Sequence, residues 1–353
     1  MRTLLSILAI GIEVVMILTL VGLSRGMIEE AGRRAKGVGA DIWVRPPGSS
    51  ALSMSSGGMD ERIIGYFAGL PGVAVATGSL VHGSGSGLET VQGIDLEQFE
   101  KMSGGFRFRS GGRFQGADDI IVDERYAAHH KLRVGSPVSV MNHAWRVSGI
   151  VEPGKLTRLF LPLKRVQELS GNTDRISQIF LKLHDPTRVD QFVEELKANP
   201  KLANYGILSI EDMVSRWSAD NIGGLKPFIG VVTFIAVTVG LIVVSITMYT
   251  AVLERTREIG ILKSLGAQPG YIMAILMRES LVLGLVGAML GIVFSYGTRW
   301  LMMRFADPML VQHIVPDWWP WTTLLAVGGA VAGTLYPALK AVRHDTLEAL
   351  SYD

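Results

Sequence analysis

The residues that come nearest to a catalytic motif are Gly149–Lys155, which read GIVEPGK. Two glycines and a lysine at this spacing form the phosphate-binding loop of nucleotide hydrolases, in which a Ser or Thr after the lysine holds Mg²⁺. Here the residue after the lysine is Leu156, which has no hydroxyl, and Pro153 interrupts the loop. We therefore predict that this segment does not bind nucleotide.

Histidines are the other residues that suggest chemistry, because imidazole binds zinc. His129, His130, His143 and His184 form no pair at the i, i+4 spacing, and adjacent histidines on a helix point in different directions. The chain has no cysteine, which excludes thiolate nucleophiles and Cys-ligated zinc. We predict solvated histidines, no catalytic site, and no cofactor or metal bound by this chain.

Glu13 is the charged residue that lies deepest in an apolar stretch of the sequence. A carboxylate at the centre of a membrane span costs about 2.5–3.5 kcal/mol on insertion scales and is by default a functional candidate. The other apolar stretches have no basic residue at the same depth. We predict a protonated Glu13 that is hydrogen-bonded across a helix or dimer interface, and a role in proton coupling is the alternative.

The composition is that of a membrane protein with a large soluble part, with 48% hydrophobic and 19% charged residues. A net charge of +2 without a basic stripe gives no reason to expect nucleic acid as a partner. A helix needs about 20 apolar residues to cross a bilayer. Four stretches approach or exceed that length, so we predict four spans in contact with lipid: Thr3–Ser24, Phe228–Leu253, Ser280–Thr298 and Trp318–Leu339.

The orientation of these spans follows from the short loops, because long domains cross a membrane largely regardless of charge. The loop 254–271 carries three basic residues and the tail 341–353 carries Arg343. Both indicate the cytoplasmic side, which places the N and C termini in the cytoplasm. We therefore predict a first transmembrane helix within 1–25, an extracytoplasmic domain over 26–225, and a second membrane domain over 226–353.

The predicted outer domain, 26–225, is long enough to have a core of its own. Its short strand patterns and short helix patterns alternate irregularly, which favours an α+β fold over a doubly wound sheet. The predicted fold class is a membrane α-helical protein with four transmembrane helices. An α+β extracytoplasmic domain is inserted between spans 1 and 2.

The loop 254–271 has a helical pattern of its own. Ile259, Leu262 and Leu265 recur at three-residue spacing among polar residues, which is typical of an amphipathic helix. Gly266 followed by Pro269 is the expected stop. We predict a short helix at the membrane surface, in which Lys263 is exposed and contributes little.

Several segments of the sequence resemble one family of transporters. The run RTREIGILKSLGA, residues 255–267, resembles the signature of the FtsX-type permease domain shared by the MacB, LolC/LolE and FtsX families of ABC transporters. Four further segments are similar to other parts of these proteins, in the same order. They are RTLLSILAIGIEVV, GADIWVRPPG, IIVDERYAAHHKLRVGSPVSV and the ending TLYPALKAVRHDTLEALSYD. The resemblance therefore covers both ends and the middle of the chain.

The resemblance implies the membrane subunit of an ABC transporter in the bacterial inner membrane. A separate cytoplasmic ATPase would bind ATP and Mg²⁺, and two permease copies would form a homodimer or a heterodimer. Expected substrates are a lipid or lipoprotein, or a drug or peptide. The alternative is a membrane-anchored receptor or scaffold without ATPase coupling.

The resemblance also implies that the loop helix docks onto the ATPase. The residues that would form this coupling helix are Arg257, Glu258, Ile259, Gly260, Ile261, Leu262, Leu265, Gly266 and Ala267.

Overall fold

The computed structural model describes residues 2–47, 58–85, 89–216, 225–306 and 310–343. The described chain forms two compact units. One contains residues 2–26, 225–306 and 310–343, and the other contains residues 27–216. The part of the expected tail at 344–353 lies outside the described residues.

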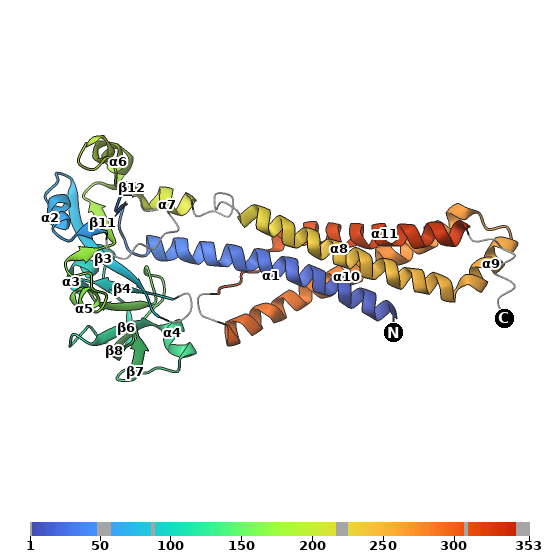
Figure 1. Cartoon of the computed structure of the whole chain (residues 1–353), viewed down its shortest axis with the longest axis horizontal. Helices are drawn as coiled ribbons and strands as arrows, with labels where there is room; N and C mark the ends of the chain where they lie inside the picture. Colours follow the sequence, from blue (N-terminus) through green and yellow to red (C-terminus); the bar gives the residue numbers. More distant parts are fainter. Residues whose placement is uncertain (1, 48–57, 86–88, 217–224, 307–309, 344–353) are drawn as a thin grey trace. The chain divides into compact units, whose positions relative to one another are not determined.

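The first unit is a bundle of long helices (Figure 1). Four described helices are long and apolar enough to cross a membrane, which confirms the predicted number. The third begins at Pro269 rather than at the predicted Ser280, since proline is well suited to the first turn of a helix. The helices are α1 (Arg2–Lys36), α8 (Leu225–Glu254), α10 (Pro269–Phe305) and α11 (Trp319–Arg343), and a short helix α9 (Thr256–Ser264) follows α8.

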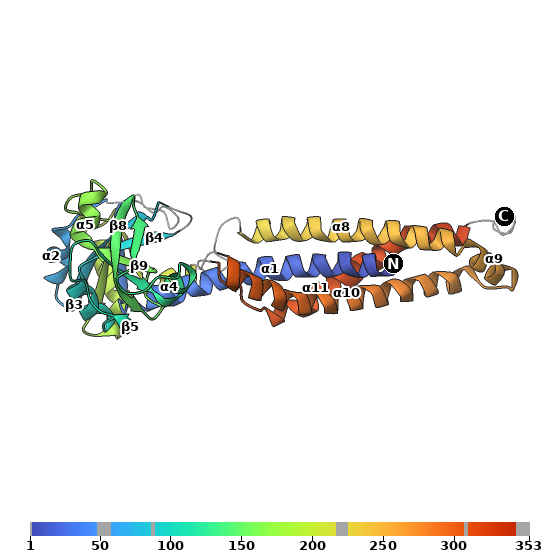
Figure 2. The same cartoon turned by 90° about the horizontal axis from the view of Figure 1, so that it is seen from below.

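Glycines allow the long helices of this unit, which are drawn in Figure 2, to approach closely. A Cβ added at Gly287 of α10 would lie 2.7 Å from Cβ of Ile10 on α1. One added at Gly333 of α11 would lie 2.7 Å from the carbonyl oxygen of Leu241 on α8. Such small residues let helix backbones meet without a side chain between them. The bundle core therefore depends on backbone contact as well as on apolar side chains.

The second unit contains a mixed sheet of ten strands, which confirms a fold that combines strands and helices between the first two spans. The strand order is β12-β1-β11-β3-β4-β9-β6-β8-β5, and β7 pairs with β8. The pairs β4–β9 and β6–β8 are parallel, whereas the other pairs are antiparallel. The strands are β1 (Ile42–Arg45), β3 (Val73–Gly83), β4 (Thr90–Ile94), β5 (Phe108–Gly111), β6 (Asp119–Asp123), β7 (Pro137–Val140), β8 (His143–Val151), β9 (Leu159–Pro162), β11 (Gln178–Leu183) and β12 (Gly206–Ser209).

Short helices and a two-stranded sheet accompany the large sheet. Asp123 ends β6 and its carboxylate accepts a hydrogen bond from the Tyr126 amide at 2.7 Å, which caps α4. The remaining elements are β2 (Met59–Asp60), β10 (Arg175–Ile176), α2 (Ile63–Ala68), α3 (Leu96–Ser103), α4 (Glu124–His129), α5 (Leu163–Leu169), η1 (Pro186–Arg188), α6 (Val189–Ala198) and α7 (Ile210–Arg216).

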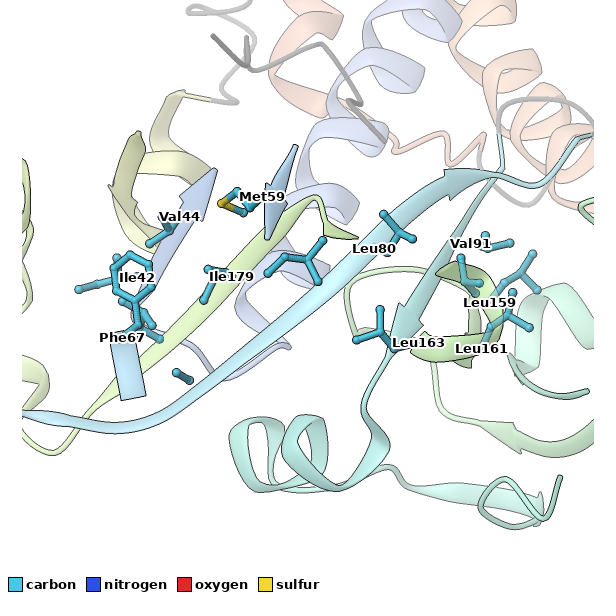
Figure 3. Packing of buried hydrophobic residues seen from close by; sticks show 14 of the residues in the cluster. Ile42, Val44, Met59, Phe67, Leu80, Val91, Leu159, Leu161, Leu163 and Ile179 are labelled. Atoms are coloured by element: carbon cyan, nitrogen blue, oxygen red, sulfur yellow. The ribbon is translucent and has the colours of Figure 1, made fainter. Parts of the chain in front are cut away.

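The core of this unit lies between the sheet and its helices. Ile42 and Val44 of β1 belong to the same buried cluster as Ile179 of β11 and Phe67 of α2 (Figure 3). All five residues of β6 are buried, as expected for a strand that is covered on both faces. Burial of this apolar surface gives the second unit a hydrophobic core of its own.

Candidate functional site

The loop between α8 and α10 forms the short helix α9, as the sequence predicts. Gly266 adopts φ +91°, and its amide donates to the Lys263 carbonyl at 3.0 Å. The Ala267 amide donates to the Leu262 carbonyl at 2.9 Å, which completes a glycine-terminated helix end. Pro269 then begins α10, so the chain reverses within five residues and the predicted stop is confirmed.

Six of the nine residues predicted for the coupling helix lie on different sides of α9, and the other three, Leu265, Gly266 and Ala267, follow its last residue. Gly260 is buried and Ile259 packs against the core of the bundle. Ile261 and Leu265 lie one helical turn apart and are 45% and 80% exposed. The sequence pattern placed Ile259 and Leu265 on one apolar face. In the structure, Ile259 packs against the bundle, whereas Leu265 is exposed. Of the remaining predicted residues, Arg257, Glu258 and Gly266 are exposed, and Leu262 and Ala267 are half-buried.

The exposed stripe of α9 also carries charge. Arg257 precedes Ile261 by one turn, and Glu258 lies beside it. Neither side chain forms an ion pair with another residue in the described ranges. We call Arg257, Glu258, Ile261 and Leu265 the outer stripe of α9. It combines two exposed apolar side chains with a cation and an anion that are available to a partner.

Lys263 joins α9 to the end of α11. Its Nζ donates to the carbonyls of Ala341 at 3.0 Å and Val342 at 2.8 Å. The expectation that Lys263 is exposed is therefore wrong, because its ammonium binds carbonyls in the last described turn of α11, and such carbonyls attract a cation. That Lys263→Ala has little effect on docking stays a prediction. Arg255, at the start of α9, forms an ion pair with Glu279 of α10 at 3.4 Å. These contacts attach α9 to two long helices of the bundle.

Glu13 lies inside the bundle, with a residue exposure of 5%. A Cβ at Gly240 of α8 would overlap its carboxylate, so the carboxyl occupies space that glycine leaves free. Its Oε1 has no hydrogen-bond partner among the described residues. The hydrogen bond predicted across a helix is thus not found for this oxygen, and a hydrogen bond across a dimer interface stays a prediction.

The segment that resembles a phosphate-binding loop has a structural role. It leaves β8 and enters β9, whereas a phosphate-binding loop leads from a strand into a helix. Lys155 Nζ donates to the Ser103 carbonyl at 2.7 Å and lies over the Phe106 ring. Burial lowers the pKa of Lys155, because the ammonium loses water.

The four candidate histidines are dispersed rather than clustered. His143 Nε2 lies 2.9 Å from an oxygen of Asp118, and the rings of His129 and His130 touch edge to face. Within the part of the chain that the structure describes, they contribute to no group of three or more ligands that could hold a metal.

An ionic cluster around the buried residues Glu30 and Arg34 of the second unit was not predicted from the sequence. Glu30, near the end of α1, accepts from Arg33 at 2.6 Å, Arg34 at 3.2 Å and Arg125 at 3.2 Å. Asp123 and Arg158 form a second, fully buried pair at 3.1 Å. Burial raises the pKa of the Asp123 carboxyl, because the carboxylate loses water. The i, i+4 spacing of Glu30 and Arg34 could have predicted their ion pair from the sequence. The contact of Glu30 with Arg125, 95 residues away, could not be predicted in this way.

Comparison with known proteins gives matches to both units. The model of the MacB-like periplasmic core domain matches residues 3–199, and that of the FtsX-like permease C-terminal domain matches residues 230–346. The ABC transporter permease YknZ of Bacillus subtilis is 31% identical over 232 residues, which cover 62% of this chain and 55% of YknZ. The macrolide export ATP-binding/permease protein MacB of Bartonella henselae is 23% identical over 381 residues, which cover 100% of this chain and 57% of that protein.

Among solved structures, the periplasmic region of MacB from Actinobacillus actinomycetemcomitans aligns with 54% of this chain and 97% of that one. The TM-score is 0.41 and the identity is 17%. The chain spans just over half the length of the YknZ and MacB proteins that it matches.

Proposed function

This chain belongs to the family of ABC transporter permeases that join an FtsX-like permease domain to a MacB-like periplasmic core domain, and we propose that it couples a cytoplasmic ATPase to movement of its outer domain. In this proposal the ATPase is a partner that binds ATP and Mg²⁺, and α9 is its docking element. The permease acts as a homodimer or heterodimer in the bacterial inner membrane, with both termini in the cytoplasm. Its substrate is a lipid or lipoprotein, or a drug or peptide.

The observation that carries the proposal is the outer stripe of α9. Leu265 is 80% exposed on a helix whose other side is fixed to the bundle. Burial of one leucine in a partner contributes roughly 1.5–3 kcal/mol. Arg257 and Glu258 flank the apolar residues, so a partner groove with complementary charges would fix the register of docking. A groove that buries both Ile261 and Leu265 would bind α9 by its apolar stripe, as helix-in-groove interfaces do.

The test replaces Leu265 by aspartate in the full-length permease, purified from its native host. A loss of about 3 kcal/mol corresponds to ~100-fold weaker binding. Leu265→Asp should therefore remain inserted and lose the ATPase that copurifies with the wild type, as measured by mass spectrometry of Walker-motif peptides. Gly266→Val should act in the same direction, because φ +91° strains any β-branched residue.

Leu169→Asp is the matched control, since Leu169 is an exposed leucine of the outer domain and should leave the ATPase bound. A Leu265→Asp permease that retains the ATPase and its ATP-driven activity would refute docking at α9. A wild-type permease that brings down no ATPase would favour the alternative, a membrane-anchored receptor or scaffold.

A further inference from the structure

A small polar cavity lies at one end of the contact between α1 and α8. Its volume is about 90 Å³, and its polar lining comes from Thr3, Ser6, Thr247, Glu254, Arg255 and Glu279. A cavity needs about 10–15 Å³ of such volume to hold one water molecule, so this cavity has room for several. Ser6 Oγ is fully buried and has no hydrogen-bond partner among the described residues. The lining and this free hydroxyl suit water rather than an apolar occupant.

Glu13 lies on the same face of α1 as Ser6, two helical turns farther along. Seven residues of helix span about 10 Å. On α8 the corresponding positions are Thr247, which lines the cavity, and Gly240, which faces the carboxylate, and these are also seven residues apart. The seam between α1 and α8 therefore carries two buried oxygens without a hydrogen-bond partner in the described ranges, one at the cavity and one deep in the bundle.

Apolar side chains fill the turn between the two oxygens. Ile10 of α1 is 1% exposed, and Val244 and Met248 of α8 are 0% and 2% exposed. All three belong to the bundle core. These three side chains lie along the seam between the cavity and Glu13, so we expect water to reach the carboxyl when α1 and α8 separate locally.

No charged group lies at the depth of Glu13 on the helices packed around it. The helices α8, α10 and α11 carry charged residues only near their ends. The titratable side chains between these charged residues are tyrosines: Tyr249, Tyr296 and Tyr336. Tyr249 is engaged by Lys340, whose Nζ donates to its hydroxyl at 2.8 Å. α1 itself has Arg2 and Arg25 as the nearest charged residues on either side of Glu13. An ionised Glu13 would be an unpaired charge in an apolar bundle, which is strongly disfavoured.

We propose that Glu13 is a proton-binding site that exchanges its proton with water from this cavity. In the packed seam the carboxyl holds the proton and rests against Gly240. When α1 and α8 separate, the O–H bond breaks, its electron pair stays on the carboxylate oxygen, and the proton passes to water as hydronium. Protonation therefore favours the packed seam, and ionisation favours the parted one. This inference does not rest on ATPase docking.

The first test is infrared spectroscopy of the full chain in lipid nanodiscs from about pH 5 to about pH 10. Glu13→Gln keeps the shape of the neutral acid and should assemble as the wild type does. The wild-type minus Glu13→Gln spectrum should show the C=O stretch of one protonated carboxyl, which disappears as the pH rises. A difference spectrum without this band at any pH would overturn the proposal. A band that persists unchanged at the highest pH would overturn it as well, because Glu13 would then be a permanently neutral structural acid.

The second test asks whether water reaches the Glu13 carboxyl by way of the cavity. In D₂O, exchange of the carboxyl proton shifts the C=O band, and the rate of this shift reports access of water. Ser6→Leu fills the cavity and should slow the shift at least ~3-fold, if opening of the seam starts there. Thr238→Leu makes a similar change at a half-buried position of α8 that does not line the cavity, and should leave the rate unchanged. Equal exchange rates in wild type and Ser6→Leu would refute the cavity as the route.

Discussion

Replacing Lys263 by glutamine should loosen α9 from the end of α11. The lysine donates, at 3.0 and 2.8 Å, to two carbonyls in the last described turn of α11, where the described residues offer no helical amide to them. Hydrogen bonds from a charged donor contribute about 1.5–3 kcal/mol. Lys263 is only half-buried, so solvent screens part of this interaction, and about 1–2 kcal/mol for the pair of bonds is the reasonable expectation. This corresponds to a roughly 5–30-fold larger population of the opened contact.

Hydrogen exchange of the full chain in nanodiscs measures that population directly. In Lys263→Gln, the amides of the last turn of α11 and of α9 should exchange 5–30-fold faster, by roughly the factor just given. Lys263→Arg keeps a cation of similar reach and should exchange nearly as slowly as the wild type. Arg257→Gln removes an exposed charge from the same helix and is the control. Unchanged exchange at the end of α11 in Lys263→Gln would show that the two hydrogen bonds do not hold α9 in place.

Two further substitutions test the units separately. Glu30→Gln removes the carboxylate that three arginines share. Because solvent screens the exposed Arg33 and Arg125, it should destabilise the second unit by about 1.5–3 kcal/mol in denaturant-dependent hydrogen exchange. Glu97→Gln, in an exposed pair, should have no measurable effect, and equal behaviour of the two would contradict the ionic cluster around Glu30. Gly287→Ala places a Cβ 2.7 Å from Ile10 and should cost about 1–3 kcal/mol, seen as a lower Tm in detergent. Gly328→Ala meets open space and should not lower Tm, so a similar loss in both variants would argue against close packing at Gly287.

Features that depend only on residues close together in the sequence were predictable. The spans follow from the length of apolar runs, and the end of α9 follows from Gly266, because only glycine adopts φ +91° without strain. The start of α10 was missed for a physical reason. Arg278 and Glu279 interrupt the apolar pattern before Ser280, but a helix can carry charges in its first turns when these lie near the membrane surface.

Contacts between distant segments could not be predicted from one sequence. The carbonyls that accept from Lys263 lie 78 and 79 residues away, and Arg125 lies 95 residues from Glu30. The periodicity of α9 was correct, but it could not tell which apolar residues face the bundle. Ile259 and Leu265 have the same chemistry, and only the packing of α9 against its own bundle separates them.

The division of α9 into an inner side that packs on the bundle and an exposed outer stripe determines how this helix could transmit a movement. A surface helix that contacted only lipid would move independently, because nothing would oppose its displacement. Here the inner residues Ile259 and Gly260 pack on the bundle, Lys263 holds the end of α11, and Arg255 holds Glu279 of α10. A partner that pushes on Ile261 and Leu265 therefore displaces α9 together with two long helices. In the proposed coupling, the outer stripe would bind the partner, and the inner contacts would transmit the partner's movement to the bundle.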